Sequence, residues 1–116
     1  MIEELIAKVF ATRNAAHLAH LRTKSYAEHV ALGSFYEGVI GAVDSLVEAH
    51  QGLFGLIDEV NVKPVKGDIA GILREDSDWI EANRNNIANG SDAVANLVDG
   101  ITACYLSTLY KLENLK

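Results

Sequence analysis

The sequence predicts an all-α protein, a bundle of four helices in which one long connection crosses the bundle between the second and third helices. Apolar residues recur at intervals of three and four in four stretches, which is the period of an α-helix. Proline occurs only once in 116 residues, so little interrupts these stretches. A short, a long and a short connection separate them, the pattern of a four-helix bundle with one crossover. The whole chain, residues 1–116, is therefore expected to form a single domain.

The composition restricts the partners and the compartment. The formal net charge is −6, which disfavours direct nucleic-acid binding. Cys104 is the only cysteine and the N-terminus lacks a signal-like segment, so we expect a cytoplasmic protein. No run of about 18 uncharged apolar residues occurs, so we expect no membrane span. Because mean hydropathy is slightly positive in so small a domain, we expect apolar surface to be buried between copies in a homo-oligomer.

The first helix is expected over residues 2–22, and its apolar stripe continues into two histidines. The residues that recur at helical spacing are Ile2, Leu5, Ile6, Val9, Phe10, Arg13, Ala16, His17 and His20. Histidines on such a stripe are either hydrogen-bonded core or interface residues, or ligands.

The second helix is expected to begin near Tyr26 and to continue to about Gln51. Ser25 and Glu28 have the S-x-x-E spacing of a capping box, in which each side chain accepts a hydrogen bond from an otherwise unpaired backbone N–H. Two glycines follow Gln51 as stop signals. The connection to the first helix is short, so these helices should pack as antiparallel neighbours.

The third and fourth helices follow the long connection. Residues 53–67 lack a clean period and have room for a turn of helix at residues 54–59. The third helix is expected to follow an N-cap at Asp68 and to run parallel to the second, and the Asn-Gly-Ser sequence at 89–91 predicts a reversal into a fourth helix, Asp92 to about Leu115. The inward positions of these helices are Ile69, Ile72, Leu73, Asp76, Trp79, Ile80, Asn83, Ile87, Val94, Leu97, Val98, Ile101, Cys104, Tyr105, Thr108 and Leu112.

One face of the second helix carries ligand-type side chains among apolar residues. At about 100° per residue, His29, Glu37, Asp44 and Glu48 fall on one face. His29 and Asp44 lie roughly 22 Å apart along the helix, so they cannot hold one ion within a single chain. An antiparallel pair of second helices, crossing near Gly38, would place His29 of one copy beside Asp44 and Glu48 of the other.

The position of the first turn decides which histidine of the first helix joins this set. A hairpin centred on Thr23 sets His17 opposite His29, whereas a centre one or two residues later puts His20 there. Two imidazoles and two carboxylates form a mixed nitrogen and oxygen set that suits iron, zinc or manganese. The alternative is that the acids lie solvated at the edge of the apolar stripe and the histidines are packed without a metal.

This spacing resembles that of a mini-ferritin of the starvation-inducible DNA-binding (Dps) type. His17, His29, Asp44 and Glu48 have the spacing of four of the five ligands of that family's iron-oxidation centre, and Gly33 stands where the third ligand, an Asp, is expected. In the family, the histidine half comes from one subunit and the Asp–Glu half from its two-fold partner. The resemblance therefore implies a ferritin-like fold and an iron site between subunits.

The resemblance also implies an activity, with two departures from the family pattern. It implies oxidation of iron(II) by peroxide or oxygen and iron storage or detoxification in a homo-oligomer of helix-two dimers, up to a dodecamer-like cage. The A-H-L at residues 19–21 is similar to the family's A-H-W and would make His20 the first ligand. The glycine at position 33 favours a single ion over a two-iron centre, with Glu37 as the side chain that could compensate.

Whether the protein is an enzyme, a ferroxidase, stays open from the sequence. The family's basic N-terminal extension is missing from this sequence, so direct DNA binding is not implied, and the short chain fits a small, phage-borne subgroup better than a standard member. The alternative is a non-enzymatic ferritin-like scaffold or interaction protein with a degenerate or merely structural metal site.

Overall fold

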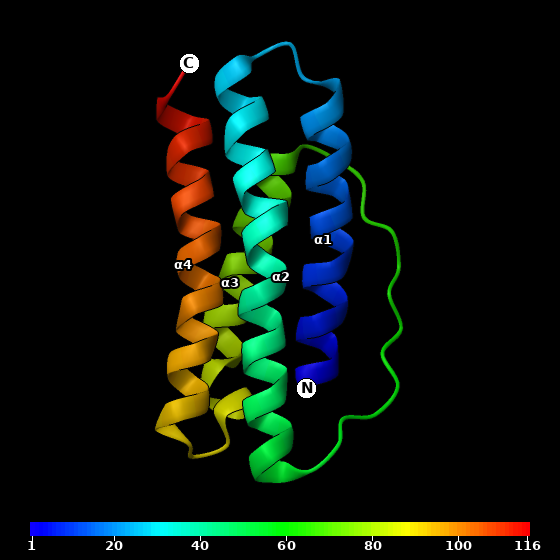
Figure 1. Ribbon diagram of the computed structural model, residues 1–116, viewed down its shortest axis with the longest axis vertical. Coiled ribbons are helices and arrows are strands. Elements are labelled where there is room, and N and C mark those ends of the chain that lie inside the picture. The colour runs from blue at the N-terminus through cyan, green and yellow to red at the C-terminus, as the bar shows by residue number, and fades with distance from the viewer.

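The computed structural model describes all residues 1–116 and contains four helices and no strand (Figure 1). The helices are α1 (Ile2–Arg22), α2 (Tyr26–Phe54), α3 (Ile69–Ala88) and α4 (Asp92–Asn114). The predicted all-α class with four helices is confirmed. The second helix continues three residues past its predicted end at Gln51, to Phe54.

The helices lie side by side along the long axis of the molecule (Figure 1). α2 packs against both α1 and α4, and α3 packs against α4 and, over a smaller area, against α1. Residues 55–68 leave the lower end of α2 and run up the outside of α1 before α3 begins (Figure 1). The turn of helix expected at residues 54–59 is wrong, because residues 55–66 have no regular structure and Gly55, at φ 92°, ends α2.

Side-chain caps explain where three of the helices begin. Ser25, Asp68 and Ser91 each accept a hydrogen bond from the backbone N–H three residues on, at 3.2, 3.1 and 3.1 Å. Each such cap stabilises its helix by about 1 kcal/mol. The second half of the expected capping box does not form, because the Ser25 N–H donates to the Thr23 hydroxyl at 3.1 Å and not to Glu28.

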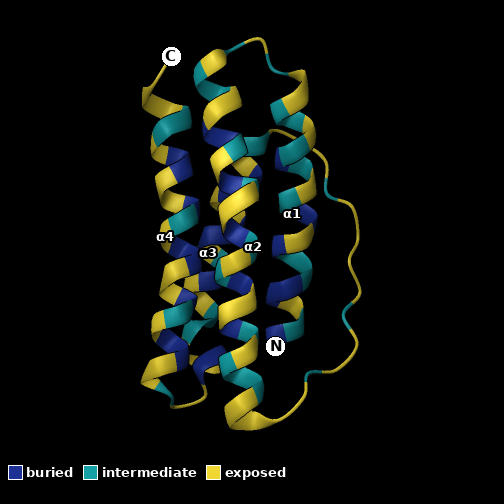
Figure 2. Cartoon of the chain, viewed as in Figure 1, coloured by how far each residue is buried: buried dark blue, intermediate teal, exposed yellow.

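The core is one cluster of mainly aliphatic residues from all four helices. Figure 2 shows buried residues on each helix. Most predicted inward positions are buried, but Phe10 is wrong, since it is 36% exposed. The predicted inward positions that are only half-buried are Arg13, His17, His20, Ile69, Trp79, Asn83, Leu97, Cys104 and Leu112. The two histidines therefore lie at the edge of the core and not within it.

α2 is more apolar than its place in the bundle requires. It is the one helix long and apolar enough, by length and composition, to cross a membrane, although the core helix of a soluble protein passes the same test. One face supplies core residues such as Leu32, Phe35 and Val39, yet only 33% of the apolar stretch is buried within the chain. Part of the rest packs at the edge of the core, whereas Tyr26, Val30, Leu53 and Phe54 are exposed.

Candidate functional site

The histidine cluster, formed by His17, His20, His29 and Tyr36, lies where α1 and α2 meet near their connection. The imidazoles of His20 and His29 stack with their centroids 3.7 Å apart and their planes at 17°. The two residues also exchange hydrogen bonds: Nδ1 of His20 lies 2.6 Å from the His29 carbonyl, and Nδ1 of His29 lies 2.9 Å from the His20 carbonyl. The pair is thus fixed by stacking and by two reciprocal bonds.

These bonds define the chemistry of both rings. A carbonyl only accepts, so each Nδ1 must carry its proton and donate it. In the neutral imidazole the proton-free nitrogen is then Nε2, which makes no hydrogen bond within the chain. The His20 carbonyl belongs to the last turn of α1, where carbonyls lack intrahelical partners, so His29 also caps that helix. Both rings consequently offer a free Nε2 in the tautomer that a transition metal requires.

Gly33 makes room for the His20 ring. A Cβ added at Gly33 would lie 3.1 Å from Cε1 and 3.3 Å from Nδ1 of His20. The His20 ring therefore occupies the space into which any side chain at position 33 would project. A carboxylate side chain at position 33 and the His20 ring in this position would therefore exclude each other.

His17 takes a different partner from the one predicted by a hairpin centred on Thr23. Its ring stacks on Tyr36, with centroids 4.0 Å apart, and the Arg13 guanidinium lies 5.3 Å from the centroid of the Tyr36 ring. His20, and not His17, lies against His29, because the turn is centred later than Thr23. Of the two arrangements left open by the sequence, the one with His20 beside His29 is the one found within the chain.

The predicted carboxylates lie away from the histidine cluster. Glu37, Asp44 and Glu48 are exposed on α2, and no three His, Cys, Asp or Glu side chains of the chain come together as a possible metal site. Asp44 follows His29 by roughly 22 Å of helix. Within one chain, therefore, at most the histidine half of the predicted ligand set lies together.

A second polar cluster, formed by Thr12, Asp76 and Tyr105, lies inside the bundle and joins α1, α3 and α4. Asp76 is 7% exposed, and its Oδ2 accepts hydrogen bonds from the hydroxyls of Thr12 and, at 2.8 Å, Tyr105. Burial raises the pKa of Asp76, and the two hydroxyl donors offset part of this effect. Burial and the nearby carboxylate also raise the pKa of Tyr105.

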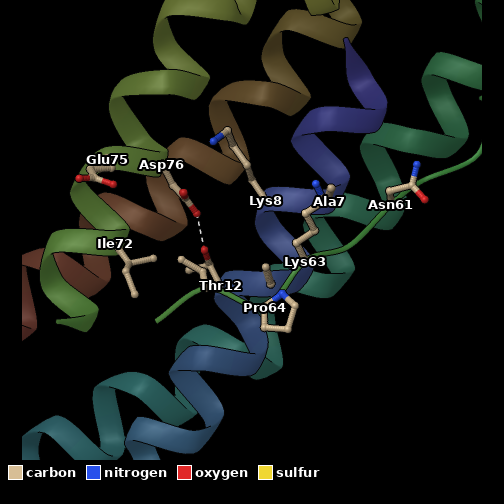
Figure 3. A pocket seen from close by; sticks show the side chains of 11 residues that line it. Ala7, Lys8, Thr12, Asn61, Lys63, Pro64, Ile72, Glu75 and Asp76 are labelled. Atoms are coloured by element: carbon tan, nitrogen blue, oxygen red, sulfur yellow. Dashed lines mark hydrogen bonds between the residues drawn. The ribbon is translucent and has the colours of Figure 1, made fainter. Parts of the chain in front are cut away.

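A cavity of about 330 Å³ lies beside this cluster, between α1, α3 and the long connection (Figure 3). Thr12 and Asp76 form part of its wall, and Lys63 and Pro64 of the connection form another part. The sequence did not predict this cluster as a site, although the helical period placed Asp76, an acid, on the inward face of the third helix. Its partners could not be paired from the sequence, because Thr12 and Tyr105 are distant along the chain.

The comparison with protein families identifies a match over most of the chain. The model of a family of unknown function (DUF5856) matches residues 20–112. The chain belongs to this family. No curated protein and no solved structure matches the chain. The DUF5856 match includes His20, His29 and Asp76, whereas Thr12 and His17 precede it.

Proposed function

We propose that this protein is a cytoplasmic, ferritin-like homo-oligomer that binds iron(II) between subunits and oxidises it with peroxide or oxygen. The observation that supports this most is the pair of His20 and His29, whose Nδ1 atoms are both occupied by carbonyls while both Nε2 atoms are free. Metal-binding histidines are commonly oriented in this way, by a hydrogen bond from the other ring nitrogen. In this proposal His20 takes the place first assigned to His17.

The remaining ligands come from a second copy of the chain. An antiparallel pair of α2 helices that cross near Gly38 brings Asp44 and Glu48 of one copy towards the histidine pair of the other. Gly38 and Gly41 suit such a crossing, since no atom of the chain lies within 4 Å of a Cβ added at either position. The unburied apolar surface of α2 also favours packing against another helix.

The ligand set suits oxidation of the bound ion. Carboxylates stabilise iron(III) more than iron(II), which favours loss of an electron, and imidazoles hold the entering ion. Two iron(II) ions each give one electron to one hydrogen peroxide, whose O–O bond breaks; with two protons, the products are two water molecules and two iron(III) ions. Zinc or manganese would fit the same mixed donor set. The ferritin-like assignment rests on the four helices and on the path of residues 55–68, which we interpret as the crossover.

A metal titration tests the proposal. Iron(II) is added anaerobically to the purified apoprotein, the bound ions are counted per subunit, and peroxide is then admitted while iron(III) absorbance is followed. The Asp44→Ala/Glu48→Ala double variant should lose iron binding. Its matched control is Asp78→Ala/Glu81→Ala, which removes two exposed acids from α3 and should bind iron normally. Equal iron oxidation by the two double variants would contradict the proposal.

A mixing experiment tests the origin of the ligands in two subunits. His20→Ala/His29→Ala and Asp44→Ala/Glu48→Ala are each expected to be inactive. A refolded mixture contains heterodimers in which one site has all four ligands, so part of the iron oxidation should return. No recovery in a mixture shown by mass spectrometry to contain heterodimers would exclude a shared site.

The second candidate function is a ferritin-like scaffold or interaction protein in which the histidines serve packing. It is favoured by the cap that His29 provides to the His20 carbonyl and by the glycine at position 33. In one version of this second function, the scaffold holds a structural zinc ion between its subunits. This function predicts an oligomer without iron oxidation, and a zinc site would show as thermal stability that is lost on chelation.

A further inference from the structure

The cavity beside Asp76 has the size of a small-molecule site. Its volume of about 330 Å³ lies at the lower end of the range for ligand pockets, roughly 300–1,000 Å³. It combines apolar side chains such as Ala11 and Ile72 with a few polar ones. This mixture is typical of sites that orient a small ligand by a few specific contacts.

One carboxylate oxygen in the cavity wall has no partner in the chain. Both hydroxyl donors, Thr12 and Tyr105, bond to Oδ2 of Asp76, and no group of the chain donates to Oδ1. Asp76 is nevertheless 7% exposed and lines the cavity. Oδ1 is not sealed from solvent, so it can accept a hydrogen bond from a donor that enters the cavity.

The cavity wall carries charged side chains of both signs. Asp76 and Glu75 come from α3, whereas Lys63 comes from the connection on the opposite wall (Figure 3). Lys8, on α1, is directed to another contact, since its Nζ lies 5.1 Å from the centre of the Trp79 ring. A ligand that spans the cavity from α3 to the connection would meet the Asp76 carboxylate at one end and Lys63 at the other.

We propose that this cavity binds a small zwitterion of the amino-acid class, with its ammonium group on Oδ1 of Asp76 and its carboxylate at Lys63. The ammonium group supplies the donor that Asp76 lacks and pairs with its charge. A metal ion is a poorer fit, because no third acidic or histidine side chain joins Asp76 and Glu75. The site is separate from the histidine cluster and is independent of the proposed iron chemistry.

The test is binding of a series of amino acids in which the distance between the two charges varies. Glycine, β-alanine, 4-aminobutyrate and 6-aminohexanoate are titrated individually into the full-length protein, and binding is followed by NMR saturation transfer and calorimetry. Butylamine and butyrate, which carry one charge each, are the ligand controls. One zwitterion of matching length should bind at least about tenfold more tightly than either control.

Two pairs of variants locate the site. Lys63→Gln should weaken binding of the best zwitterion several-fold, whereas Lys66→Gln, an exposed lysine of the same connection outside the cavity, should not. Asp76→Asn should abolish binding, and Asp78→Asn, an exposed acid of α3, should leave it unchanged. Since Lys63 is exposed, the first pair stays informative even if Asp76→Asn disturbs the fold.

Three results would overturn the proposal. They are no binding by any member of the series, equal binding by the singly charged controls, and equal effects of Lys63→Gln and Lys66→Gln. The pH dependence gives a further readout. Binding should strengthen as Asp76 ionises with rising pH, against the neighbouring charges of Glu75, Lys8 and Lys63 and the Tyr105 hydroxyl.

Discussion

The histidine cluster and the Asp76 cluster place polar side chains in opposite environments. His20 and His29 lie at the rim of the bundle, with their Nδ1 atoms paired and their Nε2 atoms without a hydrogen bond. Asp76 lies inside the bundle, with its partners Thr12 and Tyr105 supplied by the same chain. In the proposed function the first cluster is completed by a second copy, whereas the second cluster pairs its groups within the chain. The comparison predicts different costs of substitution in the two regions.

Truncation of the buried acid should have the largest effect on stability. Asp76→Ala leaves the Thr12 and Tyr105 hydroxyls without an acceptor, at about 1–3 kcal/mol for each buried donor. His20→Ala removes one stacking contact and one hydrogen bond at a half-buried position, which should cost about 1 kcal/mol. The measurement is urea unfolding of both variants followed by circular dichroism. An equal loss of unfolding free energy in the two variants would contradict the expected difference between the Asp76 cluster and the histidine cluster.

The pH dependence should separate the charge of Asp76 from its packing. Burial raises the pKa of Asp76 above its usual value of 3.8, so the folded state binds this proton more tightly than the unfolded state. Its contribution to stability is complete below pH 3.8 and is lost as the pH rises through the folded pKa. The Asp76→Asn variant stays neutral at every pH and keeps an oxygen acceptor. The melting temperature of this variant minus that of the native protein should therefore increase from acid to neutral pH. Asp78→Asn is the exposed control. A difference in melting temperature between Asp76→Asn and the native protein that decreases with rising pH would contradict the expectation.

A pair of glycine substitutions should show a smaller difference within α2. Gly41→Ala meets no atom within 4 Å, so it should stabilise the isolated chain by about 0.5–1 kcal/mol through helix propensity. Gly33→Ala places a Cβ 3.1 Å from the His20 ring, so displacement of that ring should offset most of the gain. Unfolding at low protein concentration measures both. If Gly33→Ala stabilises as much as Gly41→Ala, the His20 ring does not depend on the glycine.

The same glycines distinguish folding from assembly. If α2 helices cross near Gly38, Gly41→Ala should weaken the dimer while it stabilises the monomer. Gly33→Ala should instead act on the histidine pair. Light scattering across a dilution series measures dimerisation, and unchanged dimerisation in Gly41→Ala would contradict the proposed crossing.

The smallest effect is expected where the long connection is attached to α1. Oε2 of Glu3 accepts the Asp58 N–H at 2.9 Å, and this backbone hydrogen bond is the main reason that the pKa of Glu3 is lowered to about 2. The bond's contribution is present above pH 4.5 and is lost as the pH falls through about 2. Glu3→Gln should reduce stability slightly at neutral pH and make no difference in strong acid. Amide exchange at Asp58 gives a local readout, and an unchanged exchange rate would contradict a role for Glu3 in holding the connection.

The sequence was sufficient for the helices, because their signals are local. Ser25, Asp68 and Ser91 predicted the starts of three helices, and the apolar period predicted most of the buried positions. The prediction that Phe10 is buried was wrong because the helical period identifies the buried face of a helix but not the edge of that face. The edge depends on how closely the neighbouring helices approach. The turn expected at residues 54–59 failed because Gly55, at φ 92°, ends α2 inside that stretch.

For the candidate site, the sequence predicted which side chains could act as ligands, and the tertiary structure decided which of them meet within one chain. A shift of the hairpin centre by one or two residues exchanges His17 for His20 as the neighbour of His29, and that register depends on the packing of α1 on α2. The sequence also placed Asp76 on an inward face, from the helical period alone. Its pairing with Thr12 and Tyr105 required three helices to converge, since contacts between residues far apart in the chain are fixed by packing and not by local sequence.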